Sequence, residues 1–314
     1  GGPEALSGPV AFGRVRIPLI VGPTAVGKSE IAVELAEMIG GEVISADARA
    51  VYRDLEVGTA KPPWELRRRV PHHLLDHVPW WARYDAVKFR RDCEQAVREI
   101  LSRGRTPVIV GGSTLYVRAL TVGIFEGPGA DPRIRAELAM RSTGALYREL
   151  ERVDPRAARK IRPHDRVRII RALEVYRATG KPISHFWGKE RPFPWPLLVI
   201  GISLERGELY RRIAARVEEM FAKGLMDEAR GLFRTKLPAD VPILRTIGYA
   251  ELFDHFRGII PLEEAKRRIV ANTKAYARRQ LTWFRREPGI HWIDRTGKDT
   301  TWVAQEILSM LHGT

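Results

Sequence analysis

The segment that most restricts the fold of this chain is the run GPTAVGKS at residues 22–29. It follows the apolar run Ile17–Val21 and precedes a stretch in which Ile31, Leu35 and Met38 recur at helical spacing. A G-x-x-x-x-G-K-[ST] pattern between a strand and a helix is typical of a phosphate-binding loop (P-loop). Its backbone N–H groups and the helix N-terminus attract phosphate oxygens. The sequence therefore predicts a site for a diphosphate or triphosphate.

The residues of this loop divide by chemistry. Its glycines let the backbone curl around an anion, Lys28 supplies a positive charge, and the Ser29 hydroxyl is a candidate Mg²⁺ ligand. The residues expected to bind the diphosphate are Gly22, Thr24, Ala25, Val26, Gly27, Lys28 and Ser29.

Further strands and helices alternate after the loop. The apolar runs 43–46 and 108–110 are predicted strands, and an amphipathic helix is predicted around residues 89–101 between them. Alternation of this kind indicates an α/β fold, a P-loop NTPase-like parallel sheet flanked by helices. Ligands of such sheets bind at the carboxyl ends of the strands. Later segments continue the pattern, with a strand at 197–202 and long helices around 208–225 and 262–286.

A basic segment interrupts the sheet. Residues 131–191 hold 16 Lys and Arg against 8 Asp and Glu, with no β-like run and a clear helix from Asp165 to about Ala178. We expect an all-helical insertion. The predicted organisation is a P-loop core in two parts, residues 14–125 and 197–314, and a basic helical insertion at 126–196.

Composition narrows the class of protein. The net charge of +15 favours a polyanionic partner, and nucleic acid is the first candidate. No apolar run reaches the roughly 18–20 residues that a membrane helix needs, and residues 1–9 lack a signal or transit pattern, so a cytoplasmic protein is expected. Cys93 is the only cysteine; its spacing with Phe89, Val97 and Ile100 indicates a core residue.

The acidic residues that follow the predicted strands are not placed as in a typical nucleotide hydrolase. An NTPase usually carries an acid after a hydrophobic strand, yet the strand 108–110 is followed by glycine and serine. Asp47, after the strand 43–46, is instead placed to activate an acceptor, although a metal role remains open. The loop is therefore suited to hold a pyrophosphate leaving group.

Ten segments together resemble one family, the tRNA dimethylallyltransferases (tRNA isopentenyltransferases). They run in order along nearly the whole chain: GPTAVGKS (22–29), ISADARAVY (44–52), VGTAKP (57–62), HHLLD (72–76), VGGSTLY (110–116), RALE (171–174), TGKP (179–182), RVEEM (216–220), IGY (247–249) and YARRQLTWFR (276–285). Each is weak alone, and their combination is specific.

The resemblance implies a reaction. Dimethylallyl diphosphate would bind at the P-loop, and N6 of the adenosine 3′ to the anticodon (position 37) would attack its C1, releasing diphosphate. It also implies Mg²⁺ as cofactor and the anticodon stem-loop of tRNA as partner. We expect a monomer, because no heptad or long apolar surface helix stands out.

The resemblance also assigns residues. Asp47 matches the family's general base, Ser113 a position that contacts the target nucleotide, and Arg216 an arginine at the diphosphate. The positions that match tRNA contacts are Asp47, Ala50, Ser113, Arg135, Val167, Arg168 and Arg171. Without the resemblance, the arginines would be read as solvated helix faces. Trp283 and Phe284, in the last basic helix, are expected to pack in the core rather than stack on bases.

Two departures concern base recognition. The family commonly has Asp-Ser-x-Gln where this chain has residues 47–50 as Asp-Ala-Arg-Ala, and Ser113-Thr114 replaces a common Thr-Gly. A hydroxyl survives at Ser113, whereas the amide expected at position 50 is lost.

Other interpretations of the same residues remain. A P-loop kinase for a small acceptor, a prenyltransferase of free adenine nucleotides and a non-catalytic RNA-binding protein share part of the pattern. His72, His73 and His77 could hold a metal only if the fold presents them together, and the family motif explains the first pair.

Overall fold

The computed structural model describes residues 16–125, 127–238 and 241–313. The expectation for residues 1–9, and the start of the predicted core at residue 14, lie outside the described residues. The chain forms two compact units: residues 122–193 make up the smaller one, and the chain on either side of them makes up the larger one.

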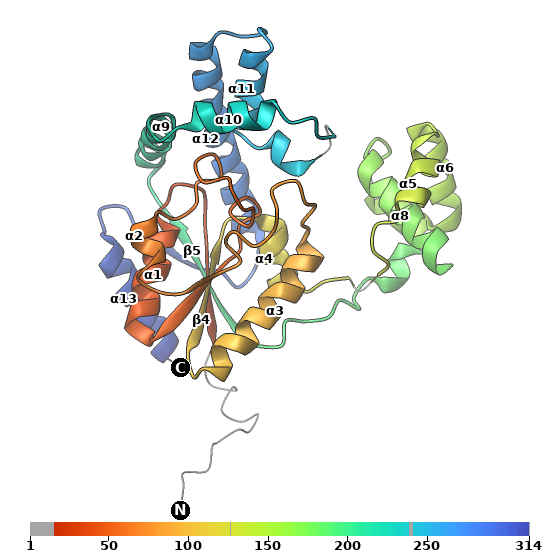
Figure 1. Cartoon of the computed structure of the whole chain (residues 1–314). Coiled ribbons are helices and arrows are strands. Elements are labelled where there is room, and N and C mark those ends of the chain that lie inside the picture. Colours follow the sequence, from red (N-terminus) through yellow and green to blue (C-terminus); the bar gives the residue numbers. More distant parts are fainter. Residues whose placement is uncertain (1–15, 126, 239–240, 314) are drawn as a thin grey trace, which may run out of the picture. The chain divides into compact units, whose positions relative to one another are not determined.

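The larger unit is built on a six-stranded sheet whose paired strands are all parallel. The spatial order is β3-β2-β4-β1-β5-β6. The strands are β1 (Ile17–Val21), β2 (Gly41–Ser45), β3 (His72–His73), β4 (Thr106–Gly111), β5 (Leu197–Ser203) and β6 (His291–Asp294) (Figure 1). The predicted α/β class with a parallel sheet is confirmed.

The strand order fixes where a ligand can bind. β1 pairs with β4 on one side and β5 on the other, and β4 separates β1 from β2. Since all these strands run in one direction, the loops after β1, β2 and β4 leave the sheet at the same edge. In open α/β sheets this edge, where the chain order switches, is the place of the ligand.

Helices cover both faces of the sheet. Figure 1 shows α1 and α13 on one side of the strands and α3 and α4 on the other. The helices of the larger unit are α1 (Lys28–Ile39), α2 (Trp64–Arg67), α3 (Ala86–Ser102), α4 (Thr114–Thr121), α9 (Arg206–Ala222), α10 (Leu225–Phe233), α11 (Tyr249–Phe256), α12 (Leu262–Arg286), α13 (Thr300–His312) and a 3-10 turn, Pro242–Arg245.

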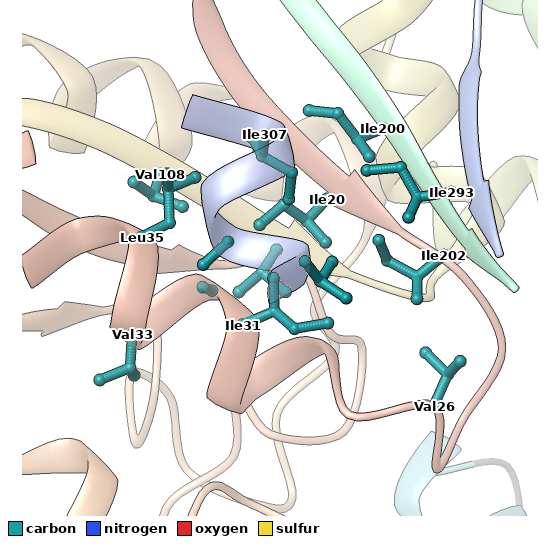
Figure 2. Packing of buried hydrophobic residues seen from close by; sticks show 14 of the residues in the cluster. Ile20, Val26, Ile31, Val33, Leu35, Val108, Ile200, Ile202, Ile293 and Ile307 are labelled. Atoms are coloured by element: carbon teal, nitrogen blue, oxygen red, sulfur yellow. The ribbon is translucent and has the colours of Figure 1, made fainter. Parts of the chain in front are cut away.

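The core on the α1 side joins strands to the two helices that cover them. Figure 2 shows Ile20 and Ile200 of the sheet close to Ile31 of α1 and Ile307 of α13, and all four are fully buried. Each such side chain contributes about 1.5–3 kcal/mol by leaving water. Met38, which continues the same helical spacing, is 37% exposed, and its neighbour Ile39 packs against this core.

Several boundaries follow simple local rules. Gly40 ends α1 in the left-handed conformation (φ 63°), and Asp85 caps α3 by accepting from Lys88 N. Cys93 is buried in α3 as expected, and this burial raises the pKa of its thiol. The long helix predicted around 208–225 is present as Arg206–Ala222, and it ends shortly before Gly224 (φ 106°), which separates it from the next helix.

The smaller unit is helical among its described residues. It contains α5 (Pro132–Ala139), α6 (Thr143–Val153), α7 (Pro155–Lys160), α8 (Arg166–Thr179) and a 3-10 turn, Ile183–Phe186. Its own core includes Leu138, Leu146 and Leu173, each fully buried. Asp165 caps α8, and Gly180 (φ 73°) ends it, as the sequence indicates. In the described part of the chain, no helix has the length and apolarity to span a bilayer.

Candidate active site

A cavity of about 320 Å³ lies at the carboxyl edge of the sheet. The P-loop, the turn after β2, the turn after β4 and Arg216 of α9 are among the parts that line it. Of the residues expected at the site, it is lined by Thr24, Ala25, Gly27, Lys28, Ser29, Asp47, Ala50, Ser113 and Arg216. The structure thus brings together residues that are up to 192 positions apart in sequence.

The P-loop curls around the end of Lys28. Its ammonium donates to the carbonyl oxygens of Gly22 (2.9 Å) and Pro23 (2.7 Å). Gly27 precedes α1 in the left-handed region (φ 91°), which glycine adopts without steric cost. Two of the expected diphosphate residues, Gly22 and Val26, are not among the lining residues, and the Val26 side chain is fully buried in the core. The loop therefore presents a cation and a helix N-terminus to the cavity.

Lys28 is held where its charge is disfavoured. Enclosure by protein, followed by the neighbouring charge of Arg216, lowers its pKa to about 7, while the charge of Asp47 acts in the opposite direction. A site with excess positive charge and little water is suited to an anion.

Asp47 follows β2 and faces the same cavity as Lys28. Its Oδ1 accepts hydrogen bonds from the backbone N–H groups of Arg49 (2.7 Å) and Ala50 (3.0 Å). These bonds fix the carboxylate at the turn. Ala50 is 3% exposed, so this position offers the cavity a small apolar surface.

Arg216 reaches the P-loop from α9. Its Nη1 donates to Thr24 Oγ1 at 3.2 Å. Burial lowers the pKa of this guanidinium, as expected for an arginine enclosed by protein. Ser113 follows β4 and lines the same cavity, and its carbonyl oxygen accepts from Val117 N at the start of α4.

Sequence reasoning left other lining residues without a role. Tyr276 and Gln280 of α12 line the cavity, and the guanidinium of Arg49 lies 5.2 Å from the centre of the Tyr276 ring. Arg245, Thr246 and Ile247 line it as well. Their motifs, IGY and YARRQLTWFR, were visible in the sequence, but no local pattern shows that they meet the P-loop. In the same helix Phe284 is fully buried, as expected, and Trp283 packs edge-on against it.

The remaining candidate tRNA residues lie in the smaller unit and differ in their surroundings. Arg135 and Arg171 both bind the buried Glu174, with closest distances of 2.7 Å each. Burial opposes the charge of Glu174, but hydrogen bonds from these arginines lower its pKa. The side chain of Arg168 is 74% exposed, and Val167 is 80% exposed. Arg135 and Arg171 therefore bind a buried carboxylate. Arg168, whose Nε lies 3.5 Å from Asp165 Oδ2, and Val167 face solvent.

The three histidines are not brought together as one site. His72 contacts the Val70 carbonyl, His73 contacts Glu42 and His77 contacts Asp92. Within the described ranges, no group of three or more His, Cys, Asp or Glu side chains could hold a metal ion.

Known proteins share both the sequence and the fold. Residues 50–287 match the model of the family described as IPP transferase, and residues 15–72 match the one described as Isopentenyl transferase. A tRNA dimethylallyltransferase of Geobacter sulfurreducens is 47% identical over 90% of this chain and 93% of its own length. One from Thermomicrobium roseum is 44% identical over 90% of this chain and 87% of its own length.

Solved structures agree. The full-length tRNA isopentenylpyrophosphate transferase of Bacillus halodurans matches with a TM-score of 0.70 at 38% identity, covering 95% of this chain and 96% of that one. A eukaryotic dimethylallyltransferase acting on tRNA matches with a TM-score of 0.80 at 28% identity, covering 90% of this chain and 74% of that one. With sequence and fold in agreement over nearly its whole length, this chain belongs to the IPP transferase family.

Proposed function

We propose that this enzyme transfers a dimethylallyl group from dimethylallyl diphosphate to N6 of the adenosine at tRNA position 37, 3′ to the anticodon. The main supporting observation is that Asp47 lines the same cavity as Lys28 and the rest of the P-loop, which we call the diphosphate cradle. A carboxylate and an anion cradle on one cavity are what a displacement of diphosphate by an amine requires.

The donor occupies the P-loop in this proposal. Lys28, Arg216 and the Thr24 hydroxyl face the diphosphate and neutralise the charge that grows on it as the C1–O bond breaks. That charge is larger in the transition state than in the bound donor, so the stabilisation raises the rate.

The acceptor enters from the side of Asp47 and Ser113. The N6 lone pair attacks C1, diphosphate leaves, and the proton of the amine passes to the Asp47 carboxylate. The Ser113 hydroxyl is placed to bind the base. Single-stranded loops suit this geometry, because their bases can be splayed out into a protein cavity.

Mg²⁺ fits the donor set of the cavity. Ser29 and Glu30 line it at the first turn of α1 and offer a hydroxyl and a carboxylate, the oxygen ligands that Mg²⁺ prefers. When bound, the ion would neutralise charge on the leaving diphosphate.

The smaller unit is the proposed anticodon stem-loop surface. Arg168 and Val167 are exposed there, and basic side chains surround them. Because the proposed substrate is tRNA, we also propose that the enzyme works in the cytosol. The absence of a heptad pattern in the sequence supports the further proposal that it acts as a monomer.

A labelling experiment tests the function. The chain is incubated with dimethylallyl diphosphate labelled in the alkyl group, Mg²⁺ and unmodified tRNA, and the labelled nucleoside is mapped. Label at the adenosine 3′ to the anticodon is the expected result. Label in free AMP, ADP or ATP instead would indicate the prenyltransferase of free nucleotides, and ADP formed from ATP would indicate a kinase.

The role of Asp47 is tested in the same assay. Asp47→Asn keeps an oxygen that accepts from Arg49 N and Ala50 N but cannot take up the amine proton. We expect turnover to fall by about 10² or more, with little change in tRNA affinity. Asp47→Ala, which also removes the turn contacts, should be at least as slow. Unchanged turnover of the asparagine variant would show that another group accepts the proton.

A further inference from the structure

The side-chain amide of Gln280 joins two walls of the cavity. It lies on α12 and is 3% exposed. Its Oε1 accepts from the backbone N–H of Thr24 at 2.9 Å, and its Nε2 donates to the carbonyl oxygen of Gly112 at 2.9 Å. One amide thus connects the P-loop with the turn that carries Ser113.

The fit around this amide is close. A Cβ atom at Gly112 would lie 2.5 Å from Gln280 Nε2, 3.1 Å from the Gly22 carbonyl oxygen and 3.4 Å from Lys28 Nζ. Only glycine permits this approach at position 112. The Gln280 amide and Lys28 therefore lie in close contact with the P-loop and with the turn after β4. A shift of any one of them would displace the others.

The two residues that Gln280 holds are next to the groups that act in the proposed reaction. The Thr24 hydroxyl accepts a hydrogen bond from Arg216, and the Thr24 N–H donates to Gln280. By fixing Thr24, Gln280 therefore also helps to orient the guanidinium of Arg216 beside the P-loop. Gly112 immediately precedes Ser113. Tyr276, one helical turn earlier on α12, also lines the cavity.

We propose that Gln280 is a positioning residue: it sets the distance between the diphosphate cradle and the turn that receives the acceptor base, so that donor and acceptor meet in reactive geometry. This inference rests on the proposed function. Its amide acts through Thr24 and Gly112 rather than on a substrate. Correct placement of two reactants lowers the barrier without adding affinity, and a misplacement of about 1 Å can cost on the order of 10² in rate.

The test is Gln280→Met, which keeps the length of the side chain and removes both hydrogen bonds. We expect the single-turnover rate of transfer to tRNA to fall by about 10- to 100-fold. The dissociation constants of dimethylallyl diphosphate and of tRNA, each measured alone, should change by less than about threefold, because each wall keeps its own groups. Gln305→Met, at an exposed position of α13, is the matched control and should behave as the wild type.

Gln280→Glu is a second variant that tests the same inference if Gln280→Met does not fold. Gln280→Glu keeps an acceptor for Thr24 N and loses the donor to Gly112, so its rate should lie between those of the wild type and the methionine variant. Unchanged rates in the two variants would overturn the inference, as would a loss of dimethylallyl diphosphate affinity equal to the loss of rate. If the wild type itself transfers no label, the proposed function fails; an active wild type with an equally active Gln280→Met removes this inference alone.

Discussion

The lowered pKa of Lys28 has a consequence for donor binding. At about 7, this pKa leaves much of the lysine neutral at the pH of the cell. A bound diphosphate places negative charge beside the ammonium and raises the pKa towards its ordinary value. Binding therefore favours the protonated form, and donor affinity is linked to pH.

The sign of this linkage gives a prediction. Below about pH 7 the lysine is already charged, whereas above it each binding event must bring a proton with it. We expect dimethylallyl diphosphate to bind more weakly as the pH rises above about 7, and to take up about one proton near pH 8. Calorimetric titration in two buffers of different ionisation enthalpy measures that uptake.

Lys28→Met is the control for this measurement. Its affinity should be lower, and its proton uptake at about pH 8 should be close to zero, because the titrating group is gone. Proton release by the wild type, or equal uptake in the two proteins, would show that Lys28 does not face the diphosphate.

At the scale of elements, α10 holds a loop that lines the cavity. The Glu228 carboxylate accepts from three successive backbone N–H groups, those of Glu56 (3.0 Å), Val57 (3.1 Å) and Gly58 (2.9 Å), and from the hydroxyl of Tyr249. The same loop continues to Thr59, Ala60 and Pro62, which line the site. One side chain of α10 thus fixes the shape of a segment about 170 positions away.

Glu228→Gln should loosen this loop. A glutamine offers one oxygen to donors that now use two, and its NH₂ group faces N–H groups, so buried donors lose their partners. We expect a loss of about 1–3 kcal/mol in the free energy of unfolding. Urea denaturation measures it, and Asp227→Asn is the control, because the Asp227 side chain on the same helix is 90% exposed and should change stability by less than about 0.5 kcal/mol. Equal stabilities of the two variants would argue against the anchoring role of Glu228.

At the scale of the molecule, charge governs the proposed encounter with RNA. The net charge is +15, and the basic residues of 131–191 outnumber the acidic ones by two to one. Not all of them are available, since Arg135 and Arg171 hold the buried Glu174. Exposed arginines such as Arg168 are the better candidates for phosphate contacts.

Salt dependence tests this division. If several phosphates are neutralised, tRNA affinity should fall at least about tenfold between about 50 and 200 mM salt. Arg168→Ala should reduce the slope of log affinity against log salt by about one and leave the melting temperature unchanged. Arg135→Ala should lower the melting temperature, because it leaves buried Glu174 short of a partner. A flat salt profile would exclude the basic surface as the docking site.

Much of the fold could be predicted because it is encoded locally. The P-loop, β1 and α12 have the bounds that their apolar periodicity and glycine positions indicate. Two details were less exact: Met38 keeps the helical period but is 37% exposed, and the helix predicted around 208–225 ends at Ala222, because Gly224 in the left-handed region separates α9 from α10. Composition predicts an insertion at residues 126–196, whereas the contacts in the structure define a separate unit at residues 122–193.

The sequence alone determined the anion cradle, the carboxylate after β2 and the parallel sheet, because each depends on a short motif or on the alternation of strand and helix. Only the tertiary structure decided what completes the cavity and which arginines of the smaller unit bind a buried carboxylate. Gln280 is 256 positions from Thr24, Glu228 is 170 from Gly58, and Arg135 and Arg171 meet on Glu174. Such pairs depend on strand order and helix packing, which bring distant segments together and which no local pattern encodes.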